Sequence, residues 1–106
     1  MNGELREIIR SGLLSCPVTP FDAEDSFDPT AFAAHLEWLS PHEIAGLIVA
    51  GGTGELFSLT PSEVVEVVKT AKATQSGQPI IAGCGYGTKL ACEMAQGIEA
   101  AGGDGI

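Results

Sequence analysis

A glycine-rich run around Thr53 is the part of the sequence best suited to bind an anion. Glycines at positions 51, 52 and 54 surround this threonine, and Glu55 follows. Successive glycines let backbone N–H groups point into one concavity that can hold a carboxylate or phosphate, and the Thr53 hydroxyl adds a donor. The alternative interpretation is a tight turn that needs glycine for positive φ. These residues alone leave both interpretations open.

A second glycine-rich run, GCGYGT at residues 83–88, partly matches the fingerprint of dinucleotide-binding proteins. Thr88 stands where the last glycine belongs, and Asp104 follows at about the spacing of a ribose-binding acid. However, Asp104 begins a predicted strand, and the run follows the third predicted strand rather than the first. We therefore disfavour dinucleotide binding. The sequence also lacks the GxxxxGK[ST] pattern of a phosphate-binding loop.

The lysines Lys69, Lys72 and Lys89 are poorly placed for catalysis. Many barrel enzymes use a lysine as a Schiff-base nucleophile, which would have to project from the carboxyl end of a strand into the barrel mouth. All three lysines fall instead on predicted helices, Lys89 in a first turn. We interpret each as a solvated surface charge, and we expect no catalytic residue within the chain.

Histidines and cysteines show no pattern of a metal or disulfide site. His35 and His42 match no standard ligand spacing, so surface or partly buried positions are expected for both. The three cysteines form no CxxC pair, which argues against a zinc knuckle or a disulfide framework. Cys16 and Cys84 lie in apolar stretches and are predicted to be small core residues. We expect no metal, no cofactor and a reducing cytoplasmic location.

The charge balance excludes several classes of partner. Fourteen acidic residues stand against five basic ones in 106 residues, for a net charge of -9. Nucleic acids and anionic membranes attract clustered positive charge, which this chain lacks. The N-terminus carries acidic residues and no long apolar run, so no signal peptide is predicted, and no apolar stretch is long enough to span a bilayer.

Apolar strands alternate with amphipathic helices along the chain, which predicts right-handed βαβ units and a parallel sheet. Local signals support the helix starts: Asp28 precedes a proline, Thr60 and Glu63 form a capping box, and Thr88 is expected to cap the last helix. The unbroken apolar run at 45–50 predicts a strand buried on both faces. The predicted helices are 4–10, 29–40, 61–75 and 88–101, and the predicted strands are 13–18, 45–50, 79–84 and the beginning of a fourth at 104–106.

Five longer segments match a known family in order and spacing: residues 12–22, 36–39, 50–61, 79–85 and 100–106. They resemble the 5-dehydro-4-deoxyglucarate dehydratases of the dihydrodipicolinate synthase and N-acetylneuraminate lyase superfamily. The match at 50–61, AGGTGELFSLTP, is the most specific. The synthase and lyase branches carry a hydroxyl residue where Gly52 stands here, so this position favours the dehydratase branch.

The resemblance implies an α/β fold of the (β/α)8 TIM-barrel type and a decarboxylating hydro-lyase. In that reaction a lysine Schiff base lets 5-dehydro-4-deoxyglucarate lose water and CO2 to give 2,5-dioxopentanoate. The glycine loop would hold the carboxylate next to the ketone, with Thr53 donating from its side chain and backbone and Gly52 and Gly54 offering backbone contacts. The first hydroxyl of the synthase loop, a proton relay there, has no counterpart at Gly52.

The same resemblance places the family's tyrosine and Schiff-base lysine on strands beyond residue 106. A barrel of this type needs roughly 250 residues. Residues 1–106 are therefore expected to be the N-terminal part of a single barrel domain, with about three βα units and the start of the fourth strand. The chain alone is expected to be inactive, and the full-length protein to bind a keto-acid sugar and form a homo-oligomer. Two alternatives stay open: a pyruvate-dependent aldolase or synthase of the same superfamily, and a non-catalytic acidic α/β module.

Overall fold

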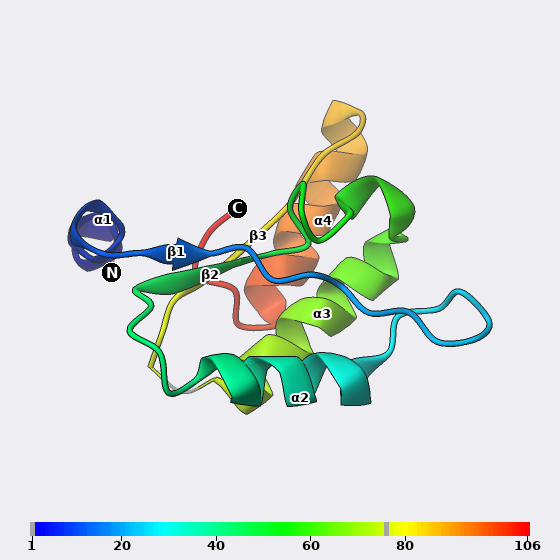
Figure 1. Cartoon of the computed structure of the whole chain (residues 1–106). Coiled ribbons are helices and arrows are strands. Elements are labelled where there is room, and N and C mark those ends of the chain that lie inside the picture. The colour runs from blue at the N-terminus through cyan, green and yellow to red at the C-terminus, as the bar shows by residue number, and fades with distance from the viewer. Residues whose placement is uncertain (1, 76) are drawn as a thin grey trace.

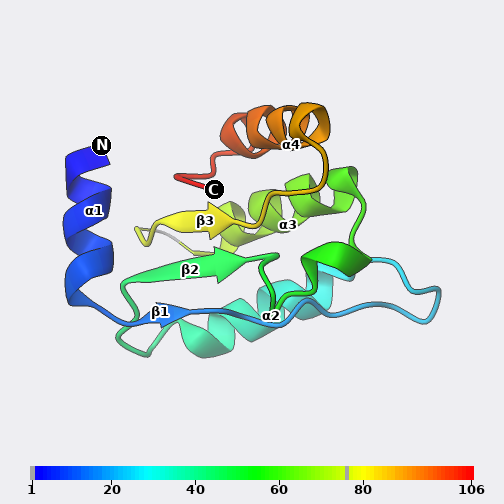
Figure 2. The ribbon, with the colours of Figure 1, turned by 90° about the horizontal axis from the view of Figure 1, so that it is seen from above.

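Three parallel strands form the sheet, in the order β1-β2-β3. The computed structural model describes residues 2–75 and 77–106. Figure 2 shows the strands running in one direction, with α1 at their amino ends. The elements in chain order are α1 (Asn2–Ser11), β1 (Leu14–Ser15), α2 (Pro29–Leu39), β2 (Gly46–Val49), the 3-10 helix η1 (Leu56–Ser58), α3 (Pro61–Thr74), β3 (Ile80–Ala82) and α4 (Thr88–Ala100).

The last residues of the chain pair with β3, as the sequence predicted. Gly105 forms a parallel bridge with Ile81. The Asp104 N–H donates to the Ile80 carbonyl at 2.8 Å, and the Ala82 N–H donates to the Gly105 carbonyl at 3.0 Å. The chain therefore contains three βα units and the beginning of a fourth parallel strand.

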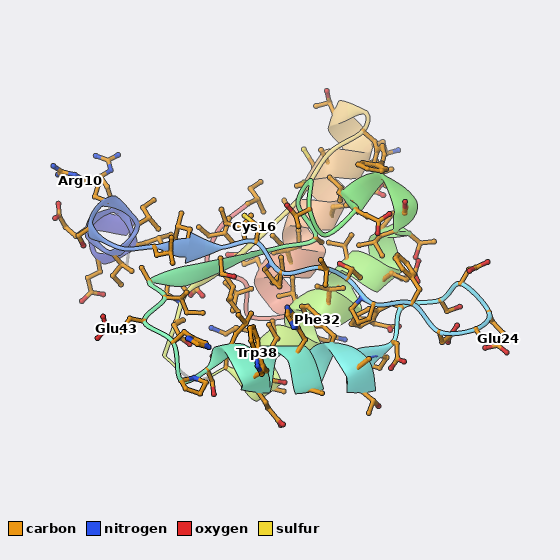
Figure 3. The ribbon with its side chains drawn as sticks, in the orientation of Figure 1. Arg10, Cys16, Glu24, Phe32, Trp38 and Glu43 are labelled. Atoms are coloured by element: carbon orange, nitrogen blue, oxygen red, sulfur yellow. The ribbon has the colours of Figure 1, made fainter. Side chains whose placement is uncertain are left out.

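Helices α2, α3 and α4 form a layer on the sheet, with α3 packed against both neighbours (Figure 1). Right-handed connections between neighbouring parallel strands place successive helices on the same face. Figure 3 shows Phe32 on the sheet-facing side of α2. The side chains that fill this interface are fully or almost fully buried: Phe32, Leu36, Leu47, Val49, Val64, Val67, Val68, Ala71, Ile80, Ala82, Met94 and Ile98.

The prediction that residues 45–50 are buried on both faces is wrong in part. Leu47 and Val49 are fully buried, whereas Ile48 between them is only partly buried. Ile48 pairs in register with Ile81, which is also partly buried. Alternate residues of a strand point to opposite faces, so the helix layer covers one face of the sheet more completely than the other.

The predicted helix starts are confirmed at two of three positions. The Asp28 carboxylate accepts from the Ala31 N–H, and Thr60 and Glu63 form a complete capping box. Thr88, however, is the first residue of α4 rather than its cap, because Gly87 occupies the N-cap position with extended backbone. Glycine is an acceptable N-cap residue through its backbone alone.

The prediction of a core position is wrong for Cys16, which is exposed, while Cys84 is partly buried against the core. β1 has two residues instead of the six predicted and pairs only with β2 in the described sheet. Cys16 follows this edge strand directly (Figure 3), where the helix layer does not cover it. Pro17 comes next and has no N–H to continue the ladder.

Helix α1 packs loosely at the amino ends of the strands. Leu5 and Ile9 are half-buried, and Ile8 is 39% exposed. Their shared face confirms the predicted amphipathic helix, although its apolar side chains remain partly open to solvent. Among the described residues, no helix combines the length and hydrophobicity required to cross a bilayer.

Candidate functional site

The glycine-rich run lies immediately after β2, at the carboxyl end of the sheet (Figure 2). We call residues 50–56 the glycine loop. Its residues with positive φ are Ala50 (48°) and Glu55 (58°). The alternative interpretation, in which the glycines themselves supply positive φ, is therefore wrong. Left-handed backbone at two residues that carry side chains is a local strain of the kind that clusters at binding sites.

Gly54 is required for close approach between two parts of the loop. A Cβ atom at this position would lie 2.9 Å from the Ala50 nitrogen and 3.1 Å from the Thr19 hydroxyl oxygen. Gly52, by contrast, is exposed, and a Cβ there would meet open space. The loop is thus closely packed at Gly54 and open at Gly52.

Hydrogen bonds within the loop leave donors at Thr53 unused. The Glu55 N–H donates to the Gly52 carbonyl at 3.1 Å, and the Leu56 N–H donates to the Gly51 carbonyl at 3.0 Å. Within residues 2–75 and 77–106, neither the N–H nor the hydroxyl of Thr53 makes a hydrogen bond. Thr53 is also exposed. The turn is therefore closed around a residue whose two donors are free for a ligand.

Two neighbouring segments attach to the glycine loop by side-chain hydrogen bonds. The buried Thr19 hydroxyl, from the segment after β1, donates to the Gly54 carbonyl at 2.7 Å. The Tyr86 hydroxyl, from the segment after β3, donates to the Leu56 carbonyl at 2.9 Å. Sequence reasoning missed both residues. The available signals were a threonine before proline at a strand end and a tyrosine between two glycines.

A further hydrogen bond links the start of α3 to the turn at 21–27. One Glu63 carboxylate oxygen accepts from the Thr60 N–H at 3.0 Å and the other accepts from the Phe27 N–H at 2.8 Å. These two donors, Thr60 first, hold the pKa of Glu63 below its ordinary value of 4.5. The carboxylate therefore fixes the helix that follows the glycine loop to the segment that follows β1.

The lysines lie where the sequence predicted. Lys69 and Lys72 are on α3, and Lys89 is in the first turn of α4. Among the described residues, no lysine falls within a strand or at the residue directly after one. Lys72 pairs with Asp104 at 3.2 Å. The three lysines therefore lie on helices and not on strands.

Asp104 lies at the opposite end of β3 from the second glycine-rich run. Its carboxylate accepts from the Ile80 N–H at 2.9 Å, at the beginning of the strand, whereas residues 83–87 follow the end of the strand. A ribose-binding acid would have to lie beside the glycine turn. This geometry excludes the dinucleotide interpretation.

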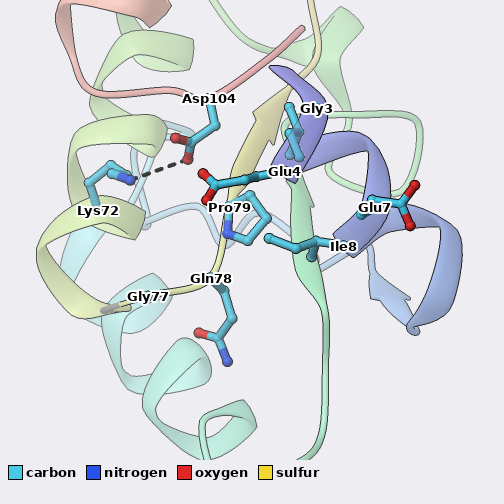
Figure 4. Close-up of a pocket in the computed structure, with 10 residues that line it drawn as sticks. Gly3, Glu4, Glu7, Ile8, Lys72, Gly77, Gln78, Pro79 and Asp104 are labelled. Carbon is cyan, nitrogen blue, oxygen red and sulfur yellow. Dashed lines mark hydrogen bonds and ion pairs between the residues drawn. The ribbon is translucent and has the colours of Figure 1, made fainter. Parts of the chain in front are cut away.

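A cavity of about 730 Å³ lies at the amino ends of the strands, away from the glycine loop. Figure 4 shows it between α1, the segment before β3 and the Lys72–Asp104 ion pair. Apolar side chains of α1 contribute to its wall, including the half-buried Leu5 and the more exposed Ile8. Its lining contains none of the candidate site residues.

Both histidines lie beside the single tryptophan, His35 on α2 and His42 just after the end of this helix. The rings of His35 and Trp38 stack at 6.0 Å between centroids, and those of Trp38 and His42 lie 5.4 Å apart. Trp38 is 65% exposed. No group of three potential metal ligands occurs within the part of the chain that the structure describes. The predicted surface or partly buried positions of His35 and His42 are confirmed.

Comparisons with known proteins agree with the arrangement of the sheet and its loops. The chain is 54% identical over 103 residues to a "Probable 5-dehydro-4-deoxyglucarate dehydratase" of Allorhizobium ampelinum, covering 97% of this chain and 34% of that protein. It is 53% identical over 104 residues to the protein of the same name from Bradyrhizobium diazoefficiens, covering 97% and 33%. The chain thus spans about a third of the length of these relatives.

Solved structures of the dihydrodipicolinate synthase family also superpose on this chain, at lower sequence identity. YagE, a prophage protein of E. coli K12 solved in complex with pyruvate, superposes with a TM-score of 0.82 at 27% identity, over 90% of this chain and 33% of that one. Dihydrodipicolinate synthase from Aquifex aeolicus superposes with a TM-score of 0.81 at 28% identity, over 89% and 32%. The parallel βα units correspond to about a third of these TIM barrels. With residues 10–106 matching its profile, the chain belongs to the dihydrodipicolinate synthetase family.

Proposed function

We propose that residues 1–106 form the N-terminal part of a single barrel domain and supply the substrate-carboxylate site of a 5-dehydro-4-deoxyglucarate dehydratase. The reaction removes water and CO2 from the substrate and yields 2,5-dioxopentanoate. A lysine of the barrel outside residues 1–106 would form the Schiff base with the substrate ketone. The protein would act in the cytoplasm as a homo-oligomer.

The observation that carries this proposal is the free donor pair at Thr53 on a closed turn at the carboxyl end of β2. Parallel α/β sheets bind ligands at this end of their strands. The Thr53 N–H and hydroxyl can both donate to one carboxylate, and Gly52 beside them leaves room for it. The curated relatives over this segment carry the dehydratase name, which supports the choice of substrate.

The test is Thr53→Val in the protein expressed from its complete reading frame. This change keeps the side-chain shape and removes the hydroxyl. We expect KM for 5-dehydro-4-deoxyglucarate to rise about tenfold, the effect of losing one hydrogen bond to a charged group. Release of CO2 and formation of 2,5-dioxopentanoate are the measurements.

Thr70→Val is the matched control, because the Thr70 hydroxyl donates to the Glu66 carbonyl within α3, outside the glycine loop. It should leave KM unchanged. An unchanged KM in Thr53→Val would contradict the carboxylate site.

A pyruvate-dependent aldolase or synthase is the second candidate, favoured by the pyruvate bound to YagE. The two candidates differ in substrate rather than in the carboxylate that the loop would hold. Turnover of pyruvate with an aldehyde, and none of 5-dehydro-4-deoxyglucarate, would establish the second candidate in place of the first.

A further inference from the structure

We propose that Tyr86 is a positioning residue for the glycine loop, acting through the carbonyl of Leu56. This inference rests on the proposed carboxylate site, because it concerns how the donors of that site are held. Tyr86 lies in the segment between β3 and α4, whereas the loop that it contacts follows β2. The contact therefore joins the carboxyl-end loops of two neighbouring strands.

The hydrogen bonds form a short chain that leads into the loop. The Tyr86 hydroxyl donates to the Leu56 carbonyl at 2.9 Å. The N–H of Leu56 in turn donates to the Gly51 carbonyl at 3.0 Å. This second bond closes the turn that contains Thr53. By holding Leu56, the phenol fixes the residue that closes the turn, and the free donors of that turn are those of Thr53.

The backbone conformation of Tyr86 is a second observation that supports a role for this residue. Its φ is 72°, in the left-handed region that L side chains rarely adopt. Gly85 and Gly87 flank it, and neither has positive φ, although glycine would adopt this conformation without strain. The left-handed backbone is thus adopted by Tyr86, whose hydroxyl donates to the neighbouring loop.

Thr19 holds the same loop from the other side. Its hydroxyl donates to the Gly54 carbonyl at 2.7 Å, and the residue is buried. The two attachments come from the segments after β1 and after β3, so the loop after β2 is held between its neighbours. Fixing a loop before the ligand arrives lowers the conformational entropy lost on binding.

The role assigned to Tyr86 differs from proton transfer. Its hydroxyl hydrogen is already donated to a backbone carbonyl, which has no proton to exchange. A positioning residue should therefore affect substrate binding and leave the chemical step unchanged. This distinction separates KM from kcat.

Tyr86→Phe in the protein expressed from its complete reading frame is the test. It removes the hydroxyl and keeps the ring and the backbone strain. Without ligand, hydrogen exchange at the Leu56 and Glu55 amides should accelerate about fivefold, the factor that one hydrogen bond is worth. Exchange at the Gly83 amide, which donates to the Val49 carbonyl, should not change and reports the integrity of the sheet. KM should rise about fivefold with kcat within about twofold of the original.

Thr19→Val should likewise raise KM and accelerate exchange in the loop, whereas Thr70→Val should do neither. Unchanged Leu56 exchange in Tyr86→Phe would overturn the positioning role. A loss of kcat with unchanged KM would also overturn it, since that pattern belongs to a catalytic group. If Thr53→Val has no effect but Tyr86→Phe still accelerates exchange, the carboxylate site fails while the structural attachment stands.

Discussion

The two ends of the sheet are built differently. At the carboxyl end, the glycine loop has left-handed backbone at Ala50 and Glu55 and receives hydrogen bonds from Thr19 and Tyr86. At the amino end, α1 packs with half-exposed apolar side chains beside an open cavity. The polar contacts there include the ion pair of Lys72 with Asp104, which is partly exposed to solvent.

The difference shows where conformational strain is retained. Strained backbone persists only when surrounding contacts over-determine it, and at the carboxyl end those contacts come from the two segments that follow β1 and β3. At the amino end, the residues with positive φ are the glycines Gly77 and Gly102, which adopt this backbone without strain, and the Lys72–Asp104 ion pair is partly screened by solvent. Barrel enzymes carry catalysis on the first end and stability on the second, so we expect substitutions at the two ends to have unequal effects.

Gly83→Ala should have the largest effect on stability. A Cβ atom at Gly83 would overlap the carbonyl oxygen of Ala50, so the glycine loop and the segment after β3 could not keep their present approach. We expect the free energy of unfolding to fall by about 3 kcal/mol. Urea unfolding followed by far-UV circular dichroism measures it.

Gly52→Ala is the matched control in the same end of the molecule, because a Cβ there meets nothing within 4 Å. It should change the free energy of unfolding by less than about 1 kcal/mol. Equal losses from the two substitutions would show that the carboxyl end is not packed around Gly83.

Glu63 should make stability depend on pH at the carboxyl end. A carboxyl whose folded-state pKa is lowered stabilises the fold above its unfolded pKa, and this contribution is lost as the pH falls. The free energy of unfolding should therefore decrease as the pH falls below 4.5, the ordinary pKa of a glutamate such as Glu63. Glu63→Gln retains one acceptor oxygen for two donors, so we expect a loss of about 1 kcal/mol at neutral pH and a weaker decline in acid.

Glu66→Gln, on the exposed side of the same helix, should change stability at neutral pH by less than about 0.5 kcal/mol. Urea titrations of both variants across the acid range provide the comparison. If the free energy of unfolding of Glu63→Gln declines in acid as steeply as that of the original protein, the Glu63 carboxylate does not account for the loss of stability in acid.

Lys72→Met should have the smallest effect. The Lys72 side chain is 35% exposed, and its partner Asp104 keeps a backbone donor from Ile80 when the lysine is removed. We expect a loss of about 0.5 kcal/mol or less, which shrinks further in high salt. Thermal unfolding at low and high salt measures both quantities. A loss of more than about 1.5 kcal/mol would show that the amino end is as tightly constrained as the carboxyl end.

Local signals predicted the elements well because their causes are local. Asp28 before proline and the Thr60–Glu63 pair specify helix starts through contacts three residues apart, and the structure confirms both. Thr88 failed as a cap because the glycine before it satisfied the same position through backbone geometry. Cys16 failed as a core residue because apolar neighbours in sequence do not reveal that its strand lies at an edge.

The sequence predicted where the glycine loop lies, but not its backbone conformation or the hydrogen bonds that hold it. The glycine loop could be located because it follows a buried strand. The positive φ at Ala50 and Glu55 could not be predicted, since it accompanies contacts from Thr19 and Tyr86, 35 and 30 residues from their acceptors. Long-range hydrogen bonds of this kind leave no periodic pattern in a sequence.

The exposed tryptophan of α2 affects how unfolding of this protein can be measured. Trp38 is the only indole in the chain, and most of its surface is in water while the core beneath it is intact. Its emission maximum should therefore shift little when the core unfolds, because the indole already lies largely in water. The position of its emission maximum is therefore a weak optical signal of unfolding, and circular dichroism of the helices is the better measurement.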